Sequence, residues 1–173
     1  MKINTEELSI RELKTEDIGL LLVLQNEVLS ENTANRETLR ENTYDDFAAC
    51  FNERSLALGV FHNGLLIGYG ILYYAGEDHE NLAYCLDTPG NVYDYANIKV
   101  IVVKNTYRGN GLQSLLIRRF EQFAAETDIK ALLCTVSPKN AYSNRNFQNN
   151  GYRLVKTVRK YGNLERYLYI KYM

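Results

Sequence analysis

Apolar and polar side chains recur along the chain with two periods, which predict a mixture of strands and helices. Residues 8–13 alternate between apolar and polar positions, as a half-buried strand does. Residues 16–29 repeat their apolar positions with helical spacing, and Thr15 before them is suited to capping a helix. A second, more polar helix is expected over residues 34–53. The first third of the chain therefore predicts one strand followed by two helices.

A hairpin is predicted next. Residues 55–61 and 65–74 are two β-rich runs, and the Asn63-Gly64 pair between them readily adopts positive φ. Residues 75–95 contain turn residues, acids and tyrosines without a sustained period. This pattern indicates a long loop with room for one short element, and loops of this length are often functional.

The second half of the chain predicts a strand, a helix, a strand, a short helix and two closing strands. The first strand is expected over residues 96–105 and is followed by a helix with apolar positions from Leu112 to Phe123. The next strand, the short helix and the two closing strands are expected over residues 130–137, 140–150, 152–161 and 164–173. The strand–helix–strand order predicts one parallel pair. Gly151 is placed to end the short helix as a left-handed C-cap. The alternating aromatics of the last strand fit either an internal strand or an edge that pairs with a second copy, so a homodimer is left open.

Length and composition indicate one globular domain over residues 1–173, because the chain is 46% hydrophobic and 24% charged. No window approaches the roughly 18 apolar residues of a membrane span, and residues 1–13 lack the apolar core of a signal peptide. A cytoplasmic protein without a membrane partner is expected. The three cysteines, at 50, 85 and 134, lack CxxC spacing and are expected to be reduced. His62 and His79 are too far apart in sequence for a helical zinc pair, so no metal is expected.

Charge is segregated along the chain. Residues 1–98 carry a formal charge of −11 and residues 99–173 one of +10, although the whole chain carries only −1. No Lys or Arg occurs between Arg54 and Lys99, where five acids fall. Solvated charges could have segregated by chance. The alternative is a basic half that holds an anionic cofactor and an acidic half that attracts a cationic substrate.

Two closely spaced glycines, Gly109 and Gly111, separate the central strand from the following helix. A helix N-terminus presents unpaired N–H groups and partial positive charge, and glycines let a ligand approach the backbone, so a phosphate group is the natural guest. A Walker A loop is excluded because no Lys-Ser/Thr follows the second glycine. A dinucleotide fingerprint fits poorly, because Ser114 stands in the third glycine position and several strands precede the loop.

The segment VVKNTYRGNGLQ resembles the acetyl-CoA loop of the GCN5-related N-acetyltransferase (GNAT) superfamily. The family pattern Gln/Arg-x-x-Gly-x-Gly/Ala is matched by Arg108 and Gly111, whereas Gln113 departs from it in the last position. A second family signature follows in register, at Asn140, Ser143, Phe147, Gly151 and Tyr152. The order of elements agrees over nearly all of the chain. The resemblance implies an α/β (α+β) acyl-CoA N-acyltransferase fold, with a mixed, mostly antiparallel sheet flanked by helices.

The resemblance also implies a site for acetyl-CoA as co-substrate. Backbone amides would hold the pyrophosphate, at Arg108, Gly109, Asn110, Gly111, Leu112 and Gln113. Val102 and Val103 would pair with the pantetheine arm and polarise the acetyl carbonyl. Asn140 and Ser143 would contact the pantetheine from the neighbouring strand. Arg145 and Lys139 are candidate partners of the adenosine phosphates.

The proton donor is left open. Family members often place a tyrosine where this chain has Phe147, and phenylalanine cannot protonate a departing thiolate. Tyr142, Tyr152 or water could do so instead.

The general base is open as well. The central strand carries Lys99 and no acid, so Asp94, Glu77 or Asp78 are candidates, and the amine could also arrive deprotonated. No catalytic residue is assigned.

The leading interpretation is an N-acetyltransferase that moves acetyl from acetyl-CoA to a primary amine of a cationic acceptor, small molecule or peptide, by direct transfer in a ternary complex. One alternative is a CoA-binding sensor without turnover, suggested by Phe147 and the missing strand acid. The other is a nucleic-acid-binding domain, which the slightly negative net charge and the absence of a groove-reading motif disfavour.

Overall fold

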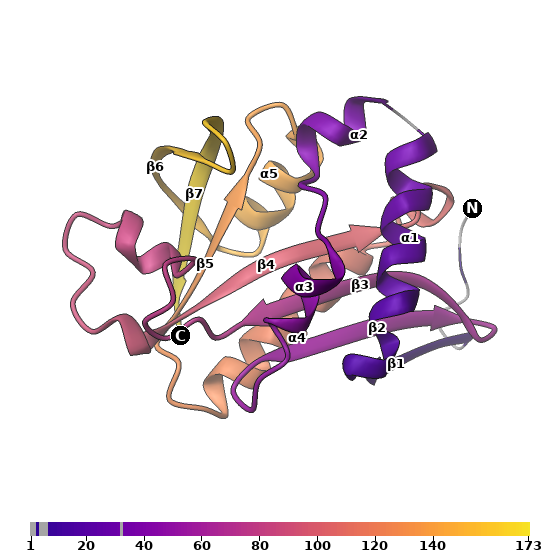
Figure 1. Ribbon diagram of the computed structural model, residues 1–173, viewed down its shortest axis with the longest axis horizontal. Coiled ribbons are helices and arrows are strands. Elements are labelled where there is room, and N and C mark those ends of the chain that lie inside the picture. The colour runs from indigo at the N-terminus through magenta and orange to yellow at the C-terminus, as the bar shows by residue number, and fades with distance from the viewer. Residues whose placement is uncertain (1–2, 4–6, 32) are drawn as a thin grey trace.

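The protein folds around one mixed sheet of seven strands with helices on both faces (Figure 1). The computed structural model describes residue 3, residues 7–31 and residues 33–173. Its strands are β1 Leu8–Glu12, β2 Leu56–His62, β3 Leu65–Tyr73, β4 Tyr95–Val103, β5 Ala131–Val136, β6 Arg153–Lys160 and β7 Leu164–Tyr172. Its α-helices are α1 Ile18–Glu31, α2 Thr33–Thr38, α3 Tyr44–Ala48, α4 Leu112–Ala125 and α5 Ala141–Asn149. Short 3-10 turns are η2 Thr15–Asp17, η3 Leu82–Cys85, η4 Val92–Asp94 and η5 Asn105–Tyr107.

The strand order is β1-β2-β3-β4-β5-β7-β6. Neighbouring strands are antiparallel except β4 and β5, which are the parallel pair predicted from the strand–helix–strand order. Helices α1 and α3 pack on one face of the sheet through residues such as Leu21 and Phe47. Helices α4 and α5 pack on the other face through Phe120 and Phe147. The mixed, mostly antiparallel architecture flanked by helices is therefore confirmed.

Helix α1 begins later than the sequence predicts. Thr15 does not cap it but lies in turn η2, and α1 starts at Ile18. The Asp17 carboxylate instead accepts from the Lys14 N–H at 2.9 Å and from the Arg11 guanidinium at 2.7 Å. The Asp17 carboxylate thus accepts a main-chain hydrogen bond before the helix, the role expected of the Thr15 hydroxyl.

The predicted helix over residues 34–53 is wrong as a single element, because two helices with a bend between them occupy it. Asn42 in the bend is buried and bonds the buried Gln25 of α1 through three contacts: Gln25 Nε2 donates to Asn42 O at 2.8 Å, and Gln25 Oε1 accepts from Asn42 N at 2.9 Å and Nδ2 at 3.3 Å. Thr43 then caps α3 in a reciprocal pair with Asp46. Tertiary bonding to α1 thus outweighs helix continuation.

The long loop over residues 75–95 contains two short turns, η3 and η4, rather than one. Leu82 and Ala83 of η3 are buried against residues of β5 and β7. The side chain of buried Asn97 ties the loop to β4, because its Oδ1 accepts from the Leu82 N–H at 3.1 Å and its Nδ2 donates to Glu80 O at 2.9 Å. The loop is therefore a packed cover over one end of the sheet.

Strands β4 and β5 stay together for only three residue pairs. Tyr95–Asn97 pair with Ala131–Leu133, and beyond them β4 continues along β3 while β5 continues along β7. The register of β3 against β4 also shifts between Ile71 and Leu72, which pair with Val100 and Ile98 and leave Lys99 as the extra residue of a bulge. The separation of the two central strands opens a cleft through the sheet.

Strand β7 is not an edge. It lies between β5 and β6, so the sheet edges are β1 and β6. The idea that the last strand pairs across a dimer is therefore wrong in its choice of strand, and any edge-to-edge pairing would use β1 or β6.

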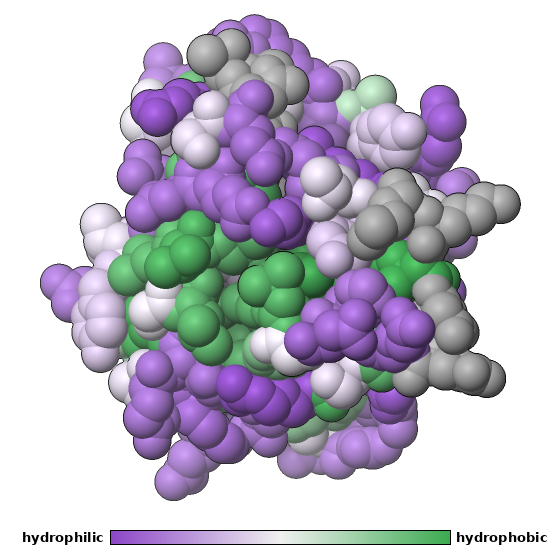
Figure 2. Space-filling view, turned by 90° about the vertical axis from the view of Figure 1, so that its right-hand side faces the viewer, coloured by the Kyte–Doolittle hydropathy of each residue, from purple (hydrophilic) through white to green (hydrophobic). Residues whose placement is uncertain are grey.

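The surface includes an apolar region. Figure 2 shows the side of the molecule at right in Figure 1, where apolar side chains gather in a hollow bordered by polar ones. Within the part of the chain that the structure describes, no helix is long and apolar enough to cross a membrane. Residues 1–2 and 4–6, on which the argument against a signal peptide partly rests, lie outside the described residues.

Candidate functional site

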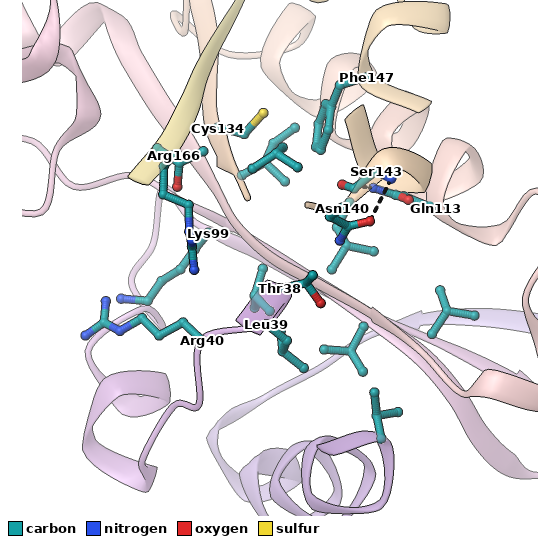
Figure 3. Close-up of a pocket in the computed structure, with 18 of the residues that line it drawn as sticks. Thr38, Leu39, Arg40, Lys99, Gln113, Cys134, Asn140, Ser143, Phe147 and Arg166 are labelled. Carbon is teal, nitrogen blue, oxygen red and sulfur yellow. Dashed lines mark hydrogen bonds between the residues drawn. The ribbon is translucent and has the colours of Figure 1, made fainter. Parts of the chain in front are cut away.

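The cleft between β4 and β5 collects most of the residues that the sequence singled out (Figure 3). Its walls come from α1, the end of α2 and the bend after it, β4, the start of α4, β5, α5, the β6–β7 turn and β7. The predicted residues that line it are Val102, Val103, Arg108, Gln113, Asn140 and Ser143. Gly109, Asn110, Gly111 and Leu112 form the adjoining loop and the first residue of α4.

The glycines of this loop both have left-handed backbones, with φ of 82° at Gly109 and 74° at Gly111. A Cβ built on either would meet no atom within 4 Å, so the space above them is open. Gly111 is the N-cap of α4 and supplies no side-chain hydrogen bond to the first turn. The helix N-terminus therefore presents its partial positive charge beside bare backbone, which suits the pyrophosphate of a CoA ester.

Other loop residues brace this geometry. The Arg108 N–H donates to Asn105 O at 3.2 Å and closes turn η5, and its place in the phosphate cradle stays a prediction. The Asn110 side chain donates to Tyr107 O at 2.9 Å and accepts from the Ile3 N–H at 3.2 Å. Leu112, the first residue of α4, is buried in the core. The arginine side chain still lines the cleft.

Gln113, the departure from the family pattern, joins α4 to α5. Its Nε2 donates to Ser143 Oγ at 2.9 Å, and its Oε1 accepts from Asn146 Nδ2 at 2.7 Å. Asn140 is the N-cap of α5 and accepts from the Ser143 N–H at 3.0 Å. Gly151, with φ of 84°, ends this helix as predicted, because its N–H and that of Tyr152 bond back to Gln148 and Phe147.

Strand β4 turns part of its main chain toward the cleft. The Lys104 N–H donates to Ile67 O on β3 at 2.9 Å. Because the backbone groups of successive residues in an antiparallel strand point to opposite sides, those of Val103 and Ile101 are directed away from β3, to the side that β5 has left. The main-chain groups of Ile101 and Val103 are therefore available for strand-like hydrogen bonds to an extended ligand in the cleft.

Two predicted phosphate partners do not line the cleft. Arg145 is exposed on α5, and Lys139 is exposed and pairs with Glu37 at 2.7 Å. Nothing in their positions brings either side chain into the cleft.

The candidate acids and bases also lie elsewhere. Asp94 pairs with Lys130 at 2.9 Å, and neither it nor Glu77 nor Asp78 lines the cleft. Tyr142 is 78% exposed, whereas Tyr152 is buried and packs edge-on against Phe147. The general-base and general-acid candidates drawn from the sequence are thus not brought to the site.

The structure brings in residues that sequence reasoning missed. Tyr161 in the β6–β7 turn has φ of 54° and lies with its hydroxyl 3.1 Å from Thr135 Oγ1, and the Arg40 guanidinium stacks 4.6 Å from its ring centroid. Arg40, Lys99 and Arg166 also line the cleft. Arg166 carried a detectable signal, because it is in phase with the buried Leu168 of the last strand.

A match to a protein-family model decides the assignment. The model described as acetyltransferase (GNAT) family matches residues 22–152, which span β2 to β5, α5 and most of α1. The chain belongs to this acetyltransferase family. No curated protein sequence matches the chain.

Solved structures share the fold of this GNAT protein. A GCN5-related N-acetyltransferase from Kribbella flavida has a TM-score of 0.73 at 18% identity, covering 98% of this chain and 100% of that one. The Salmonella typhimurium protein yncA, solved with its cofactor acetyl-CoA, has a TM-score of 0.70 at 16% identity over 96% and 94%. Arabidopsis thaliana NAA60, in complex with a bisubstrate analogue, has a TM-score of 0.72 at 14% identity over 96% and 99%. At these identities the likeness concerns the fold of the GNAT chain.

Proposed function

We propose that this GNAT acetyltransferase transfers an acetyl group from acetyl-CoA to a primary amine by direct attack in a ternary complex. The observation that carries the proposal is the cleft between β4 and β5, with the glycine loop and the α4 N-terminus at one end and a separate polar region at the other. Acetyl-CoA bound there would supply its acetyl group as an activated thioester. The related fold solved with a bisubstrate analogue supports a site that holds both substrates together.

Direct transfer is supported by the state of the cleft cysteine. Cys134 lines the cleft but is 1% exposed, and burial raises the pKa of its thiol well above the ordinary value. A buried, protonated thiol is a poor nucleophile, which disfavours an acyl-cysteine intermediate. The main-chain groups of Ile101 and Val103 at the cleft edge suit binding of an extended arm and donation to a carbonyl oxygen.

Tyr161 is the candidate proton donor, because it is the one phenol among the described residues that line the cleft. It belongs to the β6–β7 turn, in which Gly162 and Asn163 also have left-handed backbones, and its ring lines the cleft. Thr135 orients the hydroxyl from β5. The described lining contains no carboxylate, so the amine is proposed to arrive deprotonated or to lose its proton to water.

The cationic acceptor predicted from the acidic 75–94 segment stays a prediction without support from the cleft. Glu80, Asp87 and Asp94 of that segment pair with Lys99, Lys156 and Lys130 at 3.4, 2.7 and 2.9 Å. The segregated charges of the two halves therefore meet one another across the fold. A cytoplasmic location and the absence of nucleic-acid and membrane partners also stay predictions.

The proposal is tested by isothermal titration of acetyl-CoA and CoA into wild type, Gly111→Glu and Gly90→Glu, followed by thiol release with a panel of primary amines. Gly90 is the matched control, because its φ is 64° and its Cβ position is equally open, but it lies in the 75–94 segment. Binding in the micromolar range should weaken at least about tenfold in Gly111→Glu alone, since a carboxylate would face the phosphates. Wild type that binds neither compound would refute the site. Tight binding without thiol release for any amine would favour the sensor alternative.

A further inference from the structure

The end of the cleft remote from the glycine loop is lined by positive charge. Arg40 from the bend after α2, Lys99 from the β4 bulge and Arg166 from β7 all lie at this end, while Gln113, Asn140 and Ser143 lie at the opposite end (Figure 3). No Asp or Glu is among the described residues that line the cleft. The two ends thus differ in chemistry.

Arg166 is the central observation. Its residue is 5% exposed, and its Nη1 donates to the Glu165 main-chain oxygen at 2.9 Å. Among the described residues no carboxylate forms an ion pair with it. Burial lowers the pKa of this guanidinium, but arginine stays charged at any ordinary pH. Burying a charged group without a counter-ion costs free energy. The fold nevertheless keeps an unneutralised cation at this position.

The two neighbouring cations are only partly neutralised. Glu80 is shared between Arg40 and Lys99, at 3.4 Å from each, and Asp46 lies 3.7 Å from Arg40. Three cations therefore face two carboxylates, both of which stand outside the cleft lining. The balance leaves room for one further negative charge inside the cleft.

We propose that Arg166, with Lys99 and Arg40 beside it, binds an oxyanion carried by the amine acceptor, so that the acceptor is an amino acid or a related amine bearing a carboxylate. This inference rests on the proposed acetyl transfer and specifies its substrate class. The planar guanidinium can grip a carboxylate with two parallel hydrogen bonds, and the buried setting strengthens them. The acceptor's amine would then lie between this end and the cofactor end of the cleft.

The kinetic test compares matched acceptors in wild type, Arg166→Gln and the control Arg153→Gln, whose arginine is exposed on β6. The panel contains the free amino acids, their methyl esters, aminomethylphosphonate beside glycine, and the diamine putrescine. In wild type the best amino acid should exceed its ester at least about tenfold in kcat/KM. Arg166→Gln should raise KM for the acid about 10- to 100-fold and remove its advantage over the ester, since hydrogen bonds to charged groups are among the strong ones. Affinity for acetyl-CoA, measured by titration, should not change.

Preference for putrescine or for esters, or an equal loss on acid and ester in Arg166→Gln, would overturn the oxyanion site while leaving the acetyltransferase intact. A higher kcat/KM for aminomethylphosphonate alone would mean that the site binds a phosphonate and not a carboxylate, which would overturn the assignment of an amino acid as the acceptor. Failure of the proposed function looks different, because then acetyl-CoA would not bind or no amine would release thiol.

A binding measurement keeps the inference testable without turnover. The arginine Nε–H resonance that is absent from the spectrum of Arg166→Gln is assigned to Arg166. N-acetylglycine and its neutral counterpart N-acetylglycinamide are then added separately to nitrogen-15-labelled wild type, and the shift of this resonance is followed. The acid should shift that resonance at a concentration at least about tenfold lower than the amide does, as expected for a charge-assisted bond. Equal shifts, or none with either probe, would refute the assignment.

Discussion

Replacing Gln25 by Leu should destabilise the protein far more than its place on an apolar helix face suggests. Gln25 is 1% exposed, and its amide bonds both main-chain groups of Asn42, which is 4% exposed. Leucine fills a similar volume but leaves the Asn42 N–H and C=O buried without this partner. An unpaired buried polar group costs about 1–3 kcal/mol, so two groups predict a loss of about 2–6 kcal/mol in the free energy of unfolding.

Urea denaturation followed by circular dichroism measures this loss, with Gln122→Leu as the control. Gln122 is exposed on α4, and its side chain bonds only the Glu126 side chain, at 3.0 Å, among the described residues, so its replacement should change the free energy of unfolding by less than about 0.5 kcal/mol. A Gln25→Leu midpoint that implies less than about 1 kcal/mol, at an unchanged m-value, would refute the reasoning. It would mean that water reaches the Asn42 main chain or that the bend after α2 relaxes freely.

Two more predictions concern the cleft and the acid limit of stability. Tyr161→Phe removes the one phenol among the described residues that line the cleft, and it should lower kcat about 10²- to 10⁴-fold with unchanged affinity for acetyl-CoA. Tyr142→Phe, at a 78% exposed position, should leave kcat unchanged. Thiol release measured by stopped flow compares the two variants, and equal effects on kcat would exclude Tyr161 as the proton donor. Hydrogen bonds from Arg11 and from the Lys14 N–H lower the pKa of Asp17 to about 2. The ionised carboxylate therefore stabilises the folded state at pH values above the pKa that Asp17 has in the unfolded chain, and this contribution to stability is lost as pH falls through about 2. The stability difference between wild type and Asp17→Asn in thermal melts should therefore be full above about pH 5 and disappear below about pH 2, and a difference that stays constant over this range would refute the assignment.

Local pattern and turn chemistry were enough to predict most of the architecture. The hairpin at Asn63-Gly64, the parallel strand–helix–strand unit and the C-cap at Gly151 depend on a few neighbouring residues, so a single sequence reveals them. The ends of elements that depend on distant partners differ from the prediction. The helix over residues 34–53 is divided because Asn42 bonds Gln25, 17 residues away, and the entry to α1 depends on Arg11 holding Asp17.

The glycine-loop end of the cleft could be predicted from the sequence because one continuous segment, with its glycines and helix start, forms it. The opposite end could not, because its residues come from three elements that are far apart in the chain. Lys99 is turned to its position by a bulge, Arg40 by the bend after α2, and Arg166 by the pairing of β7 with β5. Segregated charge in the sequence suggested an acidic acceptor site, but folding pairs those acids with the basic half and leaves cations in the cleft. The sequence by itself thus determined the family and the glycine loop. The electrostatics of the cleft around Arg166 arose only from the tertiary structure, since charge balance depends on which side chains the fold brings within a few ångströms of one another.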